Sequence, residues 1–241
     1  MKRILLFLSA LFIATTAIAH TINWYVDGNI FHTTTCESGE NVTPPTAPEK
    51  YGYTFREWKS YTPIEYLEST GTQYIDTGFV PTTNTRIDFE FSYAFEPVNN
   101  VGQVIFGSRT TGTYNTSTDQ MYAGCNIASD GVYFYSGPTY TFIQSPVVAN
   151  NFYKKIVINS RVTGTAVQPI YMYALNLLGT AAAFSKIKIK YFQIYDNDTL
   201  VRDFVPVLDK DDIPCMYDKV ERKFYYNQGT GDFIAGPIIG E

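Results

Sequence analysis

Residues 63–91, PIEYLESTGTQYIDTGFVPTTNTRIDFEF, and residues 191–236, YFQIYDNDTLVRDFVPVLDKDDIPCMYDKVERKFYYNQGTGDFIAG, decide the fold class of this chain. Both stretches alternate short apolar and aromatic runs with Gly, Asn and Asp, which is typical of strands joined by turns. In the first stretch the alternation is clean, so Ile87, Phe89 and Phe91 are expected to face a core. Together the two stretches predict the opening and closing strands of one β-sandwich.

The residues between these stretches predict further short strands. The apolar runs are residues 104–106, 121–125, 131–135, 152–159, 169–175 and 184–195. Tyr191-Phe192 interrupts the alternation, which indicates a β-bulge. Residues 176–183 form the one weak helix candidate. Many short strands at regular spacing predict an all-β fold, either a sandwich or a jelly roll.

The composition agrees with a strand-rich chain. Hydrophobic residues make up 45% and aromatic residues 16% of the 241 residues, with 20 Tyr and 17 Phe. Aromatic side chains pack well on a pleated sheet. The formal net charge of −5 makes nucleic acid and anionic membrane surfaces poor partners. The three cysteines leave at least one thiol unpaired: Cys125 and Cys215 could pair, or Cys36 and both of these could stay single.

The N-terminus has the pattern of a secretory signal peptide. Lys2 and Arg3 precede the short apolar run of residues 4–13, and Ala17-Ile18-Ala19 fits a cleavage site. The expected organisation is a signal peptide at 1–19, a small module at 20–61 and the sandwich at 62–241. The mature chain would then be secreted, at the cell surface or in the periplasm, with no membrane span. Its oligomeric state is left open.

The small module resembles a known bacterial repeat. The matching elements are Asp27-Gly28-Asn29, Gly39-Glu40, Pro45, Pro48 and Gly52-Tyr53-Thr54-Phe55 with Trp58. This order resembles the Listeria–Bacteroides repeat, also called the internalin B-type repeat. The resemblance implies a small β-grasp-like unit at the N-terminus, in which Phe55 and Trp58 form a tiny core.

The main domain also resembles a known family. EYLESTGTQYIDTGF near its start, and MYDK followed by NQGTGDF near its end, resemble the concanavalin A-like, or LamG-like, jelly rolls of secreted gut-bacterial proteins. The resemblance covers residues 63–236 and implies a two-sheet antiparallel sandwich. It also implies glycan or surface-ligand binding. No cofactor is expected from the sequence.

The middle of the domain supplies the candidate ligand-binding residues. Sugar sites use aromatic faces with nearby amides, carboxylates and arginine. The candidates are Arg109, Asp119, Tyr122, Asn126, Tyr133, Tyr135 and Tyr140. The opposing interpretation is that the tyrosines fill a sandwich core. We expect a secreted, non-catalytic adhesion protein that binds a carbohydrate, or another ligand on host or microbial surfaces.

Two other functions are alternatives to binding. Laminarinase-type jelly rolls carry E-x-D-x-(x)-E, and the nearest match here places Arg86 where the nucleophile should stand, before Asp88 and Glu90. An arginine cannot act as this nucleophile, so no catalytic residue is assigned. A glycoside hydrolase on the same kind of fold is the alternative function. A structural or assembly subunit, which would use exposed strand edges, is the third function.

The sequence also offers two weak metal candidates. His20 at the expected new N-terminus and His32 are the only histidines, and their spacing is unlike that of a copper-binding histidine brace. Residues 209–212, Asp-Lys-Asp-Asp, could help hold a structural calcium ion, but they lack the glycine and distal glutamate of an EF-hand loop. No metal ligand is assigned.

Overall fold

The computed structural model describes residues 19–26, 29–37, 40–52, 54–55, 61–94, 102–110, 120–125, 131–159 and 168–239. The chain divides into two compact units, Met1–Trp58 and Lys59–Glu241. Residues 1–18 of the expected signal peptide lie outside the described ranges. Within those ranges no helix is long and apolar enough to cross a membrane.

The first unit contains one antiparallel hairpin. Strand β1 (Ala19–Val26) pairs with β2 (Asn29–Glu37) over their whole length. The Trp24 indole nitrogen donates a hydrogen bond to Thr34 Oγ1 at 2.9 Å across the hairpin. Phe55, expected in a small core, is instead exposed, and Trp58 lies outside the described residues.

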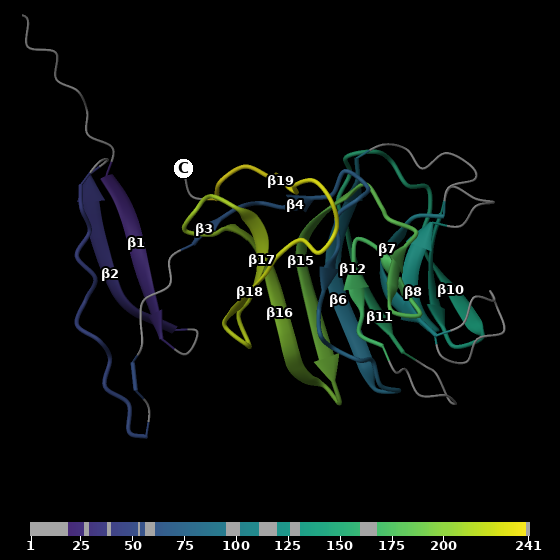
Figure 1. Cartoon of the computed structure of the whole chain (residues 1–241), viewed down its shortest axis with the longest axis horizontal. Helices are drawn as coiled ribbons and strands as arrows, with labels where there is room; N and C mark the ends of the chain where they lie inside the picture. Colours follow the sequence, from purple (N-terminus) through teal and green to yellow (C-terminus); the bar gives the residue numbers. More distant parts are fainter. Residues whose placement is uncertain are drawn as a thin grey trace, which may run out of the picture. The chain divides into compact units, whose positions relative to one another are not determined.

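The second unit contains two sheets, and the first of them has nine strands (Figure 1). Its strands are β3 (Thr62–Pro63), β4 (Leu67–Glu68), β6 (Thr85–Tyr93), β11 (Tyr153–Ile158), β15 (Ile187–Asp196), β16 (Thr199–Leu208), β17 (Pro214–Asp218), β18 (Lys223–Tyr225) and β19 (Ile234–Ala235). The main order is β11-β6-β15-β16-β17-β18; β4 lies beside β15, β19 beside β4, and β3 beside β16. The two motif-rich stretches of the sequence therefore lie side by side and build nearly all of one sheet.

The second sheet has eight strands and comes mainly from the middle of the chain. Its strands are β5 (Ile75–Asp76), β7 (Val104–Arg109), β8 (Gln120–Cys125), β9 (Val132–Ser136), β10 (Thr139–Gln144), β12 (Tyr171–Met172), β13 (Leu175–Leu177) and β14 (Thr180–Ala182). The main order is β10-β9-β8-β7-β12-β5, and β13 joins β7 to β14. Among the described strand pairs, β13 and β7 alone are parallel.

Aromatic side chains from both sheets form the core between them. The rings of Phe89 on β6 and Phe106 on β7 lie 5.1 Å apart between centroids, and Phe106 lies 5.1 Å from Phe192 on β15. All three side chains are fully buried, as are Ile87 and Phe91. The structure thus confirms the predicted all-β, antiparallel two-sheet sandwich.

Two local predictions had different outcomes. The register between β6 and β15 shifts between Ile189 and Tyr191, which confirms the predicted bulge. The weak helix candidate at 176–183 was wrong, because β13 and β14 form a hairpin there. Leu178 and Gly179 at its turn have φ angles of 55° and 85°. Two consecutive positive φ values suit a tight hairpin turn and are incompatible with a right-handed helix.

The three cysteines are all free thiols. Cys125 on β8 and Cys215 on β17 are buried in different sheets, and Cys36 on β2 is half-buried in the first unit. Burial raises the pKa of the Cys125 thiol to about 11 and that of Cys215 to about 12. The alternative with three single thiols is therefore the one observed.

Two loops from the motif-rich stretches interlock at one end of the sandwich. The Gln73 side-chain nitrogen donates to the carbonyl oxygen of Asp232 at 3.0 Å, and Thr72 Oγ1 donates to that of Thr230 at 2.7 Å. A Cβ on Gly229 would lie 2.0 Å from the Thr72 carbonyl oxygen, so a glycine is needed for this close approach. The two motif-rich stretches therefore contact each other through these loops and hold this end of the sandwich together.

Candidate ligand-binding face

Strands β8, β9 and β10 carry four of the predicted binding tyrosines on one side of the eight-stranded sheet. Because side chains alternate along a strand, the residues beside each core residue point to the opposite face. Met121 and Ala123 face the core from β8, so Tyr122 between them faces outward. In the same way Phe134 faces the core from β9, and its neighbours Tyr133 and Tyr135 face outward.

The rings form a continuous row from β8 to the edge strand β10. Tyr122 stacks on Tyr135, with ring centroids 4.4 Å apart and planes 13° apart. Tyr140 lies 5.5 Å from Tyr135 and 5.7 Å from Tyr133, and Phe142 lies 5.2 Å from Tyr133. We call these five residues the aromatic face. Such edge and offset contacts hold the rings in fixed orientations.

Exposure rises across this row toward the edge of the sheet. Tyr122 and Tyr135 are 4% and 8% exposed, whereas Tyr140 and Phe142 are 57% and 49% exposed. The buried Tyr135 supports the exposed Tyr140, and the half-buried Tyr133 contacts both Tyr140 and Phe142. The sequence analysis missed Phe142, although its alternation with Tyr140 along one strand was available as a signal.

A glycine makes room for the exposed end of the row. A Cβ on Gly131, which precedes β9, would lie 2.4 Å from the Phe142 ring. The ring therefore packs directly over the Gly131 backbone, and the close contact fixes its position. Phe142 is thus held at its base while much of its ring faces solvent.

The remaining predicted binding residues are placed differently. Arg109 on β7 pairs in register with Gln120 and is 3% exposed, so its guanidinium is enclosed by protein. Asp119 and Asn126 lie outside the described residues. Of the seven predicted residues, the structure therefore brings Tyr122, Tyr133, Tyr135 and Tyr140 into one contiguous group.

The residues of the glycosidase-like pattern lie on the outer face of β6, each beside a partner. Arg86 stacks its guanidinium 4.0 Å above the Tyr195 ring. Asp88 accepts a hydrogen bond from the Tyr191 hydroxyl at 2.8 Å, and Glu90 lies 3.9 Å from the Lys190 ammonium. These contacts give each side chain a structural role in the sheet.

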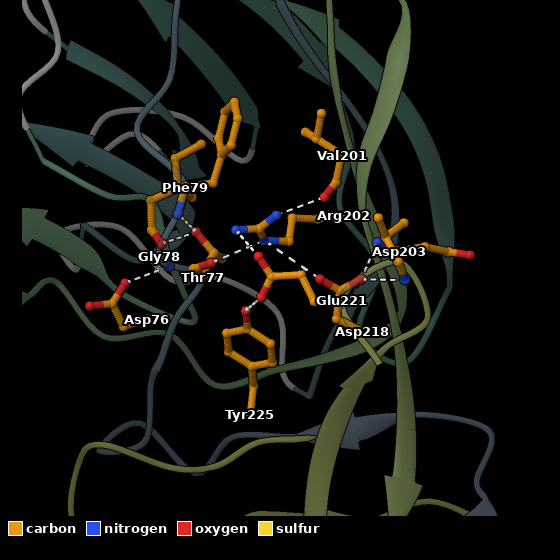
Figure 2. A network of polar contacts seen from close by, with 12 residues as sticks. Asp76, Thr77, Gly78, Phe79, Val201, Arg202, Asp203, Asp218, Glu221 and Tyr225 are labelled. Carbon is orange, nitrogen blue, oxygen red and sulfur yellow. Dashed lines mark hydrogen bonds and ion pairs between the residues drawn. The ribbon is translucent and has the colours of Figure 1, made fainter. Parts of the chain in front are cut away.

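A second polar group joins β16 to β17, to the turn between β17 and β18, and to Tyr225 at the end of β18 (Figure 2). The Arg202 guanidinium lies 2.6 Å from Glu221 Oε1 and 3.5 Å from Asp218 Oδ2, and also donates to the Thr77 carbonyl oxygen at 3.4 Å. The Tyr225 hydroxyl donates to the other Glu221 oxygen. Arg202, Glu221 and Tyr225 line an open pocket of about 540 Å³.

The chemistry of this polar group suits structure more than ligand binding. Asp218 is fully buried and accepts hydrogen bonds from the backbone amides of Asp203 and Val220 at 2.9 and 3.0 Å. Burial raises the pKa of the Asp218 carboxyl, while these amides and Arg202 act in the opposite direction. A buried carboxylate of this kind needs its cation and its donors to remain charged. Both amides bond Oδ1, and the Arg202 ion pair at 3.5 Å is the contact of Oδ2.

Neither metal candidate assembles a ligand set in the described part of the chain. His20 lies on β1 opposite Cys36, and His32 lies on β2 opposite Trp24. His20 and Trp24 are four positions apart along β1, so the two histidines are separated by about 13 Å along the hairpin. Asp209 accepts hydrogen bonds from two backbone amides and from the Tyr226 hydroxyl. No group of three or more His, Cys, Asp or Glu side chains suited to a metal occurs among the described residues.

No family model, curated protein or solved structure matches this chain. The aromatic face therefore rests on its own geometry as the candidate functional site.

Proposed function

We propose that this protein is a secreted, non-catalytic binding protein that holds carbohydrate, or another surface ligand, on its aromatic face. The observation that carries the proposal is the half-exposed pair Tyr140 and Phe142. Tyr140 packs on the buried Tyr135, and Phe142 packs on Tyr133 and over Gly131. Pyranose rings present flat C–H surfaces that pack on such aromatic faces. A preformed row of rings loses little side-chain entropy when a ligand binds.

The chemistry of the edge favours a neutral ligand. Strand β10 is Thr139-Tyr-Thr-Phe-Ile-Gln144 and carries no charged side chain. The hydroxyls of Tyr133 and Tyr140 add hydrogen-bonding groups beside the rings. An uncharged glycan, with both C–H faces and hydroxyl groups, matches this mixture of apolar and polar surface better than an ionic ligand does.

A glycan array tests the proposal. We expect the wild-type chain to bind a group of neutral glycans, and the Tyr140→Ala/Phe142→Ala double variant to lose those signals. Tyr51→Ala is the matched control, because Tyr51 is a fully exposed aromatic residue in the first unit. An absence of hits for the wild type, or equal loss in the control, would contradict the proposal.

Secretion is the second part of the proposal and has a separate test. The supporting feature is the signal-like sequence that ends at Ala17-Ile18-Ala19. Expression in a Gram-negative host should yield exported protein whose N-terminal residue is His20. Uncleaved protein retained in the cytoplasm would contradict this part and leave the binding proposal to be judged by the array.

A further inference from the structure

The edge strands of the two sheets differ in their charge. The main strand orders end at β10 and β5 in one sheet and at β11 and β18 in the other. Strand β11 carries Lys154 and Lys155, β18 carries Lys223, and β5 is two residues long and carries Asp76. Charge and short length are the usual protections against edge-to-edge pairing. Strand β10 has six residues and no charge. The uncharged β14, joined only to β13, has three.

Strand β10 is also open to solvent along most of its length. Thr139, Tyr140, Thr141 and Phe142 are all exposed, and β9 is its one strand partner among the described residues. A long, exposed, uncharged edge with β-branched and aromatic residues is a template for another strand.

The β9–β10 hairpin determines which backbone groups are available. Ser136 and Thr139 flank a two-residue turn, and the register pairs them directly. Such flanking residues exchange hydrogen bonds with each other, and the next pair along does not. The amide and carbonyl groups of Tyr140 therefore point away from β9, and by the same alternation so do those of Phe142.

We propose that a second copy of this chain adds its own β10 to this edge in antiparallel orientation. Tyr140 of one copy would stand opposite Phe142 of the other, so the outward-facing groups of both residues exchange hydrogen bonds. The two-fold axis then passes between the two copies of Thr141. The register is self-complementary, as a closed two-fold interface requires.

The charges of the chain favour a second copy as the occupant. The whole chain carries a net charge of −5, yet the residues at this interface carry none. Two copies can therefore meet here without like charges standing opposite each other. Tyr140 and Phe142 of different copies would become cross-strand aromatic neighbours, a favourable pairing. If the proposed function holds, the two aromatic faces would join into one bivalent surface.

The first test is the mass of the purified chain in solution. Light scattering after size-exclusion chromatography should give the mass of two chains at micromolar concentration, and Thr141→Lys should reduce it to that of one chain. This change places two ammonium groups at the two-fold axis. The control is Ile156→Lys, at an exposed position on the charged edge β11, and this variant should remain a dimer. A monomeric wild type, or a mass that grows without limit, would overturn the proposal.

The second test fixes the register by cross-linking. Residues at a non-hydrogen-bonded antiparallel position have Cα atoms about 4.5 Å apart, within the range that a disulfide spans. Thr141→Cys should therefore give a disulfide-linked dimer under mild oxidation, made in a Cys36→Ser background because Cys36 is half-buried. Thr139→Cys is the matched control. It should not form a disulfide-linked dimer, because residue 139 stands opposite residue 143 of the other copy in this register. Equal cross-linking of both variants, or a dimer that Thr141→Cys does not link, would overturn the proposed register.

Discussion

The side-chain nitrogen of Gln73 donates a hydrogen bond to the carbonyl oxygen of Asp232, 3.0 Å away. These residues stand 159 positions apart in the chain. The oxygen of the same amide accepts hydrogen bonds from the Ser69 hydroxyl at 3.0 Å and the Thr70 amide at 2.8 Å. One buried side chain therefore joins the loop after β4 to the loop before β19.

Gln73→Ala should destabilise the sandwich by about 2 kcal/mol, because it removes a fully buried side chain that bonds the buried Ser69 hydroxyl and the part-buried backbone groups of Thr70 and Asp232. Urea unfolding followed by circular dichroism measures this change. Gln228→Ala is the control, since Gln228 is an exposed glutamine in the facing loop. Equal stability of the two variants would show that the Gln73 contacts do not hold the loops together.

Gly229→Ala should also destabilise the sandwich. The new Cβ would lie 2.0 Å from the Thr72 carbonyl oxygen, so the backbone of one loop must move. Overpacking of this kind costs about 1–3 kcal/mol. Thr230→Ala, at an exposed neighbouring position, should leave the unfolding midpoint unchanged. A Gly229→Ala protein as stable as the wild type would mean that the loops do not approach this closely.

Arg202→Met should lower the free energy of unfolding by about 3 kcal/mol, because it leaves the buried Asp218 carboxylate without its cation. Without the arginine the pKa of Asp218 should rise further. A carboxyl with a raised pKa in the folded state favours folding when protonated, and this stability is lost as pH rises through that pKa. The difference in free energy of unfolding between the wild type and Arg202→Met should therefore become smaller in acid. Lys210→Ala, at an exposed pair, is the control; a deficit independent of pH would contradict this account.

Thiol reactivity should distinguish the three cysteines in the native protein. Cys36 is half-buried, whereas Cys125 and Cys215 are buried, with pKa values of about 11 and about 12. A thiol reagent at pH 8 should therefore label one site quickly and the other two only after unfolding. Mass spectrometry of the labelled protein gives the site. Rapid native labelling of Cys215 would contradict the placement of β17 in the sandwich.

The same thiols predict a loss of stability in alkali. Their pKa values are raised in the folded state from an ordinary value of 9.0, so the stability linked to their protonated forms is complete below pH 9. It is lost as pH rises through about 11 and about 12. Cys215→Ala should show a shallower decline of the unfolding midpoint over this window than the wild type. An identical decline in both proteins would rule out a contribution from Cys215.

The sandwich could be predicted because its strands carry a strong local signal. The alternation in residues 86–91 specifies which side chains of β6 face the core, and the observed burial follows it. The hairpin at residues 176–183 could not be predicted, because it depends on a positive φ at Leu178, which leucine rarely adopts. Local residue preference there is overruled by pairing with β7.

The candidate site could be predicted only in part. Alternation places Tyr133 and Tyr135 on one face of a strand, but it does not tell which face of the sheet is packed. Arg109 is polar and near the tyrosines in sequence, yet it is enclosed, whereas the apolar Phe142 is exposed. Which strand lies at the edge depends on pairing between distant segments, and that information is absent from local sequence.

The affinity of the aromatic face for its best glycan is the most direct measurement of the central claim. Isothermal titration calorimetry should compare the wild type with Tyr140→Ala, Phe142→Ala and the control Tyr51→Ala. We expect each of the first two variants to bind at least tenfold more weakly, a loss of about 1.4 kcal/mol, and the control to match the wild type. Unchanged affinity in both β10 variants would contradict the assignment of the aromatic face as the binding site.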